Sequence, residues 1–384
     1  MRLQRGRPDD AGPLFARALA LRERAPGPDS LDYAWALNEW AVWLQAAGRP
    51  QEALRARAQV LELRRRHLGD GHPLVAWSVS NLAYQHQAMG DFRSAEELFR
   101  RCLAMRERGL GPDHPDVASG LKNLANLLLG MGRYDEAGTL FERALAVRER
   151  AFGPDHAEVA NSLNDLASLR RALGDYAAAR AGVERALAIR ERVFGPDHPE
   201  VATSLANLAA LLAELGDDAH ARRLYERAVA IRERVFGPAH PGTGIALEEL
   251  ARVAERQGRR AEAEDLVRRA LAAKERGLGP DHPSVARTLD ILAGLLAGTG
   301  RHDEARAAAR RALAIRETAI GPGTPETAAS LQRLGALEAA DGRAAAACSL
   351  LARAAALREA ALGAAHPALA ATLAALGAAQ ARLP

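Results

Sequence analysis

Aromatic side chains are scarce in this sequence. Tryptophan, tyrosine and phenylalanine together make up 4% of the 384 residues, although hydrophobic residues make up 48%. Alanine and leucine supply most of the apolar material, and both have high helix propensity. No apolar run approaches the roughly 18 residues that a membrane span requires, and the first residues do not resemble a signal peptide. We therefore expect a helical, cytoplasmic protein that is not bound to a membrane.

Cysteine and lysine are also rare. Cys102 and Cys348 lie far apart in the sequence and suggest no disulfide framework. The 52 basic residues include two lysines, Lys122 and Lys274, so arginine supplies almost all of the positive charge. We attribute this bias to a GC-rich, bacterial genome. The net charge of +4 is small for the length of the chain.

The arginines alternate with glutamates, as in Arg190-Glu191-Arg192. Such alternation is typical of a solvated helix face that carries local ion pairs. We therefore predict that these arginines are exposed. The same mixture of charges argues against a phosphate-binding stripe, and so against nucleic acid as a partner, although the pI is about 9.4.

The strongest signal is a tandem repeat with a period of 42 residues. It is marked by a connector of the form Gly195-Pro196-Asp197-His198-Pro199. A fixed period without insertions indicates a repeat array. The connector glycines are Gly27, Gly69, Gly111, Gly153, Gly195, Gly237, Gly279, Gly321 and Gly363. A second series with the same spacing is Gly6, Gly48, Gly90, Gly132, Gly174, Gly216, Gly258, Gly300 and Gly342.

Each repeat contains the pattern of two helices. In residues 201–215, called helix A, Leu205, Leu208 and Leu212 fall on one helical face with Ala209. Gly216 follows this segment, and glycine favours the backbone conformation that ends helices. Residues 218–236, called helix B, carry the apolar stripe Ala221, Leu224, Tyr225, Ala228, Val229 and Ile231. We therefore predict 18 helices, no strands and one all-α solenoid over residues 1–384. It comprises a half repeat (1–26, helix B only), eight repeats (27–362) and a final helix A (363–384).

The spacing resembles that of the tetratricopeptide repeat family, and the 42-residue period with its connector is similar to the kinesin-light-chain subclass. The matching positions are Leu208-Ala209, Gly216, Ala221, Tyr225 and Ala228. The resemblance covers the whole chain. It implies a right-handed superhelix of antiparallel helix pairs, with the A helices lining a concave groove. The connector at 321–325 lacks the Asp-His pair, and residues 344–383 are rich in alanine, so we expect looser packing there.

One histidine stands in most connectors. Because consecutive histidines are one repeat apart, they cannot share a metal ion, and we predict that they act in turns and as helix N-caps rather than as metal ligands. The histidines are His72, His114, His156, His198, His240, His282 and His366.

No pattern of catalytic residues is present. The sequence has no phosphate-binding loop, no His-Glu-x-x-His and no Gly-x-Ser-x-Gly. Cys102 takes the place of a packed alanine of other repeats, so we expect it to be buried, and Cys348 lies in a run of small residues. We therefore predict a protein that is not an enzyme and needs no cofactor and no metal.

One side of helix A faces away from the core leucines, and by analogy with the family it lines the groove. The sequence contains seven asparagines, and all of them fall at these positions. An amide offers donors and an acceptor and can pair with the backbone of an extended peptide. The alternative is that these amides bond across neighbouring A helices. The candidate partner-binding residues are Trp35, Asn38, Trp77, Asn81, Tyr84, Lys122, Asn123, Asn126, Asn161, Asn164 and Asn207.

Four tryptophans lie near the start of the array. Trp35 and Trp77 share one repeat position, and they either anchor a partner or pack against each other or the preceding helix. Trp40 stands at a core leucine position and is expected to be buried, and Trp43 is also expected to be structural.

Both ends of the array carry apolar side chains without a polar capping helix. They include Leu14 near the start and Leu369, Leu373 and Leu376 near the end. Either the chain is part of a longer protein or these ends contact another surface, for example by end-to-end self-association. The sequence thus favours a scaffold that binds an extended segment of another protein. The alternative is the sensor or autoinhibitory region of a larger signalling protein, such as one with a nucleotide-binding switch domain.

Overall fold

A computed structural model of the chain describes residues 8–319, 321–363 and 366–383. Within these ranges the chain forms 18 α-helices and no strand, as the repeat predicts. The helices are α1 (Pro8–Arg24), α2 (Leu31–Ala46), α3 (Pro50–Leu68), α4 (Pro73–Ala88), α5 (Phe92–Leu110), α6 (Pro115–Gly130), α7 (Tyr134–Phe152), α8 (Ala157–Ala172), α9 (Tyr176–Phe194), α10 (Pro199–Glu214), α11 (Asp218–Phe236), α12 (Pro241–Arg256), α13 (Arg260–Leu278), α14 (Pro283–Gly298), α15 (His302–Ala319), α16 (Pro325–Ala340), α17 (Ala344–Leu362) and α18 (Pro367–Gln380).

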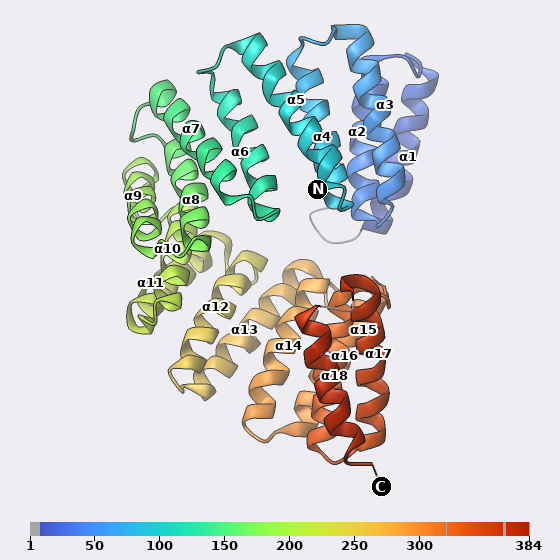
Figure 1. The fold of residues 1–384 in the computed structure, drawn as a ribbon, viewed down its shortest axis with the longest axis vertical. Helices are drawn as coiled ribbons and strands as arrows, with labels where there is room; N and C mark the ends of the chain where they lie inside the picture. Colours follow the sequence, from blue (N-terminus) through green and yellow to red (C-terminus); the bar gives the residue numbers. More distant parts are fainter. Residues whose placement is uncertain (1–7, 320, 364–365, 384) are drawn as a thin grey trace. The chain divides into compact units, whose positions relative to one another are not determined.

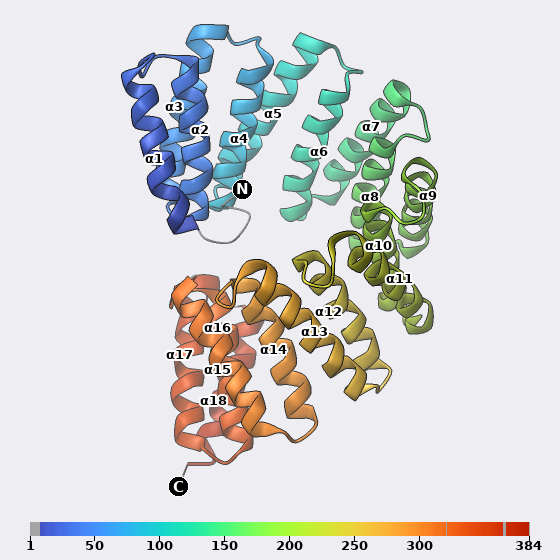
Figure 2. The same ribbon diagram turned by 180° about the vertical axis from the view of Figure 1, so that it is seen from behind.

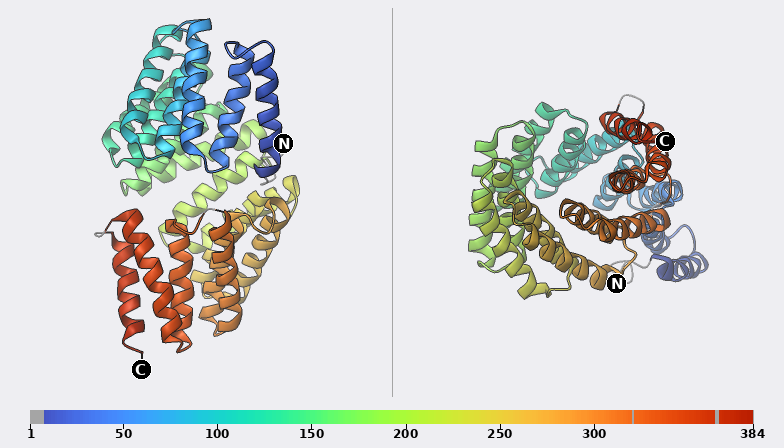
Figure 3. Two further views of the ribbon diagram at one scale, coloured as in Figure 1. Left: turned by 90° about the vertical axis from the view of Figure 1, so that its right-hand side faces the viewer. Right: turned by 90° about the horizontal axis from the view of Figure 1, so that it is seen from below.

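The chain divides into two compact units, Met1–Leu211 and Leu212–Pro384. Within each unit, consecutive helices pack as antiparallel pairs (Figure 1), and the reverse view shows the same pairing (Figure 2). In the second unit, the orange and red helices α15 to α18 lie side by side (Figure 3). The even-numbered helices from α2 to α18 are the A helices, and the odd-numbered ones are the B helices. The A helix α6 also contacts α8, and α16 contacts both α14 and α18.

Glycine ends the helices where the sequence predicts. Gly195 follows α9 with φ of 83°, and Gly216 lies just after α10 with φ of 81°. A side chain with Cβ disfavours this left-handed conformation, so glycine is the residue that allows the chain to reverse here. The repeated glycines therefore account for the constant lengths of the helices.

The core confirms the predicted faces of the two helices. Leu205 and Ala209 of α10 are fully buried, and Tyr225 of α11 is 2% exposed. Cys102 is also buried, as expected, and its thiol donates to the carbonyl of Ala76 at 3.2 Å. Burial raises the pKa of this thiol, so the reactive thiolate is disfavoured. Cys348 is partly buried.

Two predictions about packing are wrong. Trp40 is only partly buried, because it stacks on Trp43 at 4.5 Å between ring centroids at the margin of the core. Leu369 is buried because α18 packs on α17, so it does not belong to an exposed end. Leu14 and Leu373 are 54% and 50% exposed, as the uncapped ends predict. Gly6 lies outside the described residues.

Candidate functional site

A basic side chain recurs on every B helix of the array at the 42-residue interval. We call these residues the basic ladder: Arg22, Arg64, Arg106, Arg148, Arg190, Arg232, Lys274, Arg316 and Arg358. Six of them are buried: Arg64, Arg148, Arg190, Lys274, Arg316 and Arg358. Charged groups are rarely buried unless they are paired, so we expect each of these six to have a hydrogen-bond acceptor nearby.

Each buried member of the ladder donates to a hydroxyl of the following A helix, 14 residues later. Arg148 Nη1 lies 2.6 Å from Ser162 Oγ, and Arg64 Nη1 lies 2.8 Å from Ser78 Oγ. The remaining pairs are Arg190 with Ser204, Lys274 with Thr288, Arg316 with Ser330 and Arg358 with Thr372. The ladder therefore joins each B helix to the A helix of the next repeat.

This ladder overturns the prediction that alternating arginines form only a solvated face. Arg190 is 4% exposed, although its neighbour Arg192 lies on the surface. Burial lowers the pKa of Arg190, and the Glu200 carboxylate, 3.3 Å away, acts in the opposite direction. The overlooked signal was a basic residue at a fixed repeat position with a hydroxyl 14 residues later. Short-range alternation could not reveal it, because the partners lie on different helices.

Two tryptophans surround the ladder residue Arg64. Its Cζ lies 5.1 Å from the ring centroid of Trp35 and 5.0 Å from that of Trp77, and the two rings are 6.5 Å apart. Nη2 of Arg64 has no hydrogen-bond acceptor in the described part of the chain. An aromatic face attracts a cation through its quadrupole. The tryptophans therefore take the place of a counter-ion, while remaining 49% and 37% exposed.

In the second unit, carboxylates neutralise two ladder residues directly, whereas Arg358 donates to the amide oxygen of Gln332. Glu248 of α12 is fully buried, and its Oε1 lies 2.5 Å from Lys274 Nζ. Asp290 of α14 pairs with Arg316 in the same way. Both acids stand 26 residues before their basic partner. The same position carries Asn38, Ser80, Lys122, Asn164 and Ala206 in earlier repeats.

The predicted partner-binding residues lie on the A helices of the first unit, and we call this surface the A-helix face. Tyr84 is 44% exposed and its ring packs edge-on against Phe99. Asn126 and Asn207 are exposed, whereas Asn38 is 4% exposed. The half-buried members are Asn81, Lys122, Asn123, Asn161 and Asn164.

The asparagines differ in their bonding. Asn161 accepts from Arg190 Nη2 of the B helix α9 at 2.6 Å, which is an internal bond but not the predicted alternative of a bond between A helices. Asn123 Nδ2 makes a long contact of 3.5 Å with Ser80 Oγ on α4. Asn164 Oδ1 is buried and has no partner in the described chain. Thus Asn161 and Asn123 make contacts within the array, whereas the amide oxygen of Asn164 accepts no hydrogen bond in the described chain.

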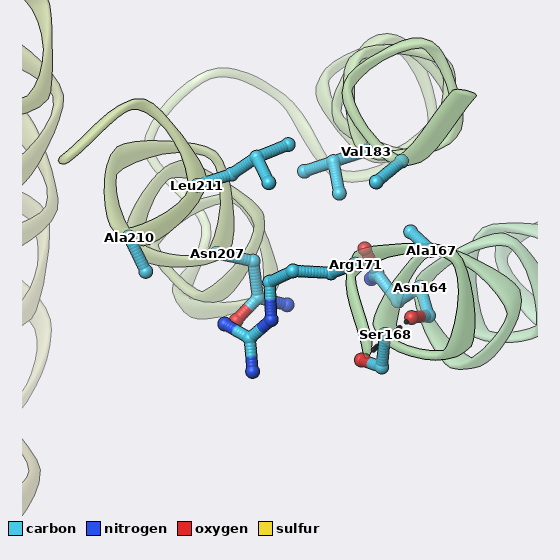
Figure 4. Close-up of a pocket in the computed structure, with 9 residues that line it drawn as sticks. Asn164, Ala167, Ser168, Arg171, Val183, Asn207, Ala210 and Leu211 are labelled. Carbon is cyan, nitrogen blue, oxygen red and sulfur yellow. Dashed lines mark hydrogen bonds between the residues drawn. The ribbon is translucent and has the colours of Figure 1, made fainter. Parts of the chain in front are cut away.

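A small pocket lies on this face between α8, α9 and α10 (Figure 4), with a volume of about 120 Å³. Asn164 and Arg171 reach it from α8 and Asn207 from α10, and Figure 4 shows Arg171 extending toward Asn207. Its apolar wall includes Val183 and Leu211. Next to Asn164, burial raises the pKa of Asp165, and the Lys122 ammonium opposes that shift. The pocket combines amide groups with an apolar wall, which suits one side chain and the adjoining backbone of a peptide.

No cluster of three or more histidine, cysteine or acidic side chains with metal-binding geometry occurs in the described ranges. None of the helices over these ranges is both long and apolar enough to cross a bilayer.

The repeat geometry agrees with comparisons with known proteins. Models of the tetratricopeptide repeat match residues 1–66, 32–108, 74–137, 116–182, 163–234, 219–276, 270–318 and 327–368. The chain belongs to the tetratricopeptide repeat family. No protein with a curated description matches the sequence.

Solved structures show similar arrays. A putative kinesin light chain from Podosopora anserina is 27% identical over 54% of this chain and 98% of its own, with a TM-score of 0.46. BtubC (BKLC) from P. vanneervenii is 26% identical over 60% of this chain and 90% of its own, with a TM-score of 0.49. A signal transduction ATPase with a tetratricopeptide repeat sensor, from Pyrococcus horikoshii, is 12% identical and has a TM-score of 0.58. That match covers 96% of this chain and 54% of the ATPase.

Proposed function

We propose that the chain is a non-catalytic scaffold that binds an extended segment of a partner protein on the A-helix face of the first unit. The observation that carries this proposal is the restriction of all seven asparagines to the A helices from α2 to α10. The amides of Asn126 and Asn207 are exposed, and Asn164 Oδ1 accepts no hydrogen bond in the described chain. Such groups can pair with a peptide backbone irrespective of the peptide's side chains.

The two ends of this face supply different contacts. Near α2 and α4, the exposed rings of Trp35, Trp77 and Tyr84 offer aromatic anchors of the kind that dominate protein interfaces. Between α8 and α10, the 120 Å³ pocket offers a recess for a single side chain. An extended segment is therefore a better fit than a flat domain surface, because the polar groups follow successive helices.

The test is selection of peptides from a randomised twelve-residue display library on the intact protein. We expect selected peptides to bind the wild type and to lose affinity when Asn81, Asn123 and Asn164 are all changed to alanine. A neutral hydrogen bond contributes about 0.5–1.5 kcal/mol, so the triple change should weaken binding by roughly one to three decades.

A matched control separates binding from folding. Gln51→Ala and Thr139→Ala remove exposed polar groups from the B helices α3 and α7 and should leave peptide affinity unchanged. If the asparagine variant binds normally but melts much earlier than the wild type, the amides serve the array itself and the proposed binding face is wrong.

A second function is favoured by one observation. The sensor-bearing ATPase has the same fold along 96% of this chain, and this chain spans 54% of that protein. A sensor region would bind its ligand on the same face and pass the signal to an attached switch domain. Nucleotide-hydrolysing sequence continuous with this chain in the gene would favour the sensor function over that of a free-standing scaffold.

A further inference from the structure

Two recurring sets of polar side chains are bonded within the array. Each connector histidine caps the following A helix, with its Nδ1 between 3.1 and 3.2 Å from the backbone N–H two residues later, which confirms the predicted N-cap role. The buried members of the basic ladder donate to hydroxyls of the next A helix. The polar groups of the A-helix face are arranged differently, and their spacing bears on the conformation of a bound segment.

On the A-helix face, polar side chains 43 residues apart come together where neighbouring A helices meet. Asn123 Nδ2 of α6 lies 3.5 Å from Ser80 Oγ of α4. Asn164 of α8 and Asn207 of α10 line the same pocket (Figure 4). Between these two pairs, the ammonium group of a third pair opposes the shift in the pKa of its carboxyl group. We call them the interhelix pairs: Ser80 with Asn123, Lys122 with Asp165, and Asn164 with Asn207.

The spacing of the interhelix pairs matches one extended conformation. The axes of packed helices are about 8–10 Å apart, so consecutive pairs are separated by about that distance. A polyproline II chain has three residues per turn and rises about 3.1 Å per residue, so every third residue points the same way about 9 Å further on. In a β-strand the same direction recurs at every second residue, after about 6.6 Å. The pairs therefore fit a polyproline II segment better than a strand.

The hydrogen-bonding groups of the face suit the same conformation. A polyproline II backbone has no internal hydrogen bonds, so its carbonyl groups are free to accept. The exposed amides of Asn126 and Asn207 offer N–H donors for them. An α-helical segment has already paired its carbonyl groups, so it could not use these donors along its length.

Exposed aromatic rings lie at the start of the face. Trp35 and Trp77 are 49% and 37% exposed with their rings 6.5 Å apart, and Tyr84 is also exposed. Proline-rich segments dock in grooves lined by aromatic rings, because their preformed conformation loses little entropy on binding. At the other end of the face, Val183 and Leu211 give the pocket an apolar wall against which a proline ring can pack.

The charges of the face balance each other. At the four repeat positions that the candidate residues occupy, α2 to α10 carry the charged side chains Glu39, Lys122 and Asp165, and Arg171 lines the pocket. Two acids thus oppose two bases. Because desolvation of an unpaired charge is unfavourable, this nearly neutral face complements an uncharged segment better than a strongly acidic or basic one.

We propose that the segment bound by the A-helix face is proline-rich and adopts the polyproline II conformation, with every third residue directed toward the face. This inference rests on the proposed function, because it defines the ligand of the same face. Twelve residues in this conformation span about 37 Å, and the four intervals between α2 and α10 span about 32–40 Å. Prolines contact the indole rings of Trp35 and Trp77, and carbonyl groups further along accept from the asparagine amides.

The first test uses a fluorescein-labelled peptide of four Pro-Pro-Ala triplets, titrated with the full chain and followed by fluorescence anisotropy. The control has the same composition, but the second proline of each triplet is D-proline, whose opposite φ prevents the polyproline II helix. We expect the first peptide to bind at least tenfold more tightly than the control and than a peptide of four Glu-Glu-Ala triplets. Equal affinities, or tighter binding of the acidic peptide, would overturn the proposal.

A pair of variants tests the contact with the indole rings. Trp35→Leu should weaken binding of the Pro-Pro-Ala peptide at least fivefold. Phe152→Leu removes a ring of similar exposure, 41%, from the B helix α7 and should leave the affinity unchanged. Circular dichroism checks that both variants are folded, and the peptide comparison on the wild type decides if Trp35→Leu is not. A folded Trp35→Leu protein with wild-type affinity would contradict the proposed contact.

The library selection described above separates this inference from the proposed function. We expect the selected peptides to carry proline at every third position. Selected peptides that lack proline but still depend on the asparagines would overturn the inference and leave the binding face in place. If neither the library nor the Pro-Pro-Ala peptide yields any binding, both the inference and the proposed function are wrong.

Discussion

The two units of the array have the same repeat of helix pairs. They differ in the residue that occupies one A-helix position, 26 residues before each member of the basic ladder. In the second unit, the position 26 residues before a ladder residue carries Glu248, Asp290 or Gln332, and the two carboxylates each neutralise a buried cation. In the first unit, the same position carries neutral groups such as Asn38 and Asn164, or Lys122. There the buried arginines rely on hydroxyls, on acids of the next first turn, and on tryptophan rings.

Because of this difference, some polar groups on the A helices are used in bonds within the array, whereas others remain free to contact a partner. A carboxylate that is bonded to a buried cation cannot also bind a partner. The pocket-lining amide of Asn164, whose oxygen accepts no hydrogen bond in the described chain, is not occupied in this way. The repeat thus keeps its fold while the chemistry of its A helices changes along the chain, and this is why we assign binding to the first unit.

The largest expected effect comes from breaking an ion pair in the second unit. Glu248→Ala leaves Lys274 buried without its carboxylate, and removing one member of a buried pair costs about 3–5 kcal/mol. The free energy of unfolding measured in urea should fall by that amount. Asn164→Ala, at the same repeat position, is the control and should cost no more than about 1 kcal/mol, because its Oδ1 has no partner.

A double variant sharpens that comparison. Glu248→Leu with Lys274→Met replaces the pair by apolar side chains and should restore most of the lost stability. If the single Glu248→Ala protein is as stable as the wild type, the carboxylate does not stabilise the buried Lys274. The proposed difference between the two units would then be wrong.

A smaller effect is expected where tryptophan replaces the acid. Trp77→Leu removes one of the two rings over Arg64 and should lower the free energy of unfolding by about 2 kcal/mol, the scale of a desolvated cation–π contact. Tyr84→Leu, on the same helix α4, removes an edge-on ring contact with Phe99 and should cost about 1 kcal/mol. Equal losses for the two variants would show that Arg64 gains nothing specific from the indole.

The smallest energetic effect concerns the ends. Leu14 and Leu373 are 54% and 50% exposed, so we expect either end-to-end association or fraying. Light scattering should show a mass that rises with concentration, and Leu14→Gln with Leu373→Gln should abolish the rise. Hydrogen exchange should show weak protection before about residue 25 and after about residue 344. A monomeric chain with protected terminal helices would contradict this prediction.

Much of the fold is predictable from the sequence because its signals are local. Glycine at a fixed period marks the helix ends, and the spacing of Leu205, Leu208 and Leu212 marks the buried face. The buried state of Arg190 was not predictable from local alternation, because its partner Ser204 belongs to the next helix. The partial exposure of Trp40 and the burial of Leu369 depend on how far neighbouring helices cover them, which residue type alone does not specify.

The most direct test of the assignment of binding to the first unit is site-specific photo-cross-linking with a peptide selected on the wild-type protein. Ala210 of α10 lines the pocket, and Ala336 of α16 holds the same repeat position in the second unit. A photoreactive phenylalanine analogue is placed at one position or the other. We expect the peptide to cross-link strongly from position 210 and weakly from position 336. Equal cross-linking from both, or stronger cross-linking from position 336, would contradict a binding face confined to the first unit.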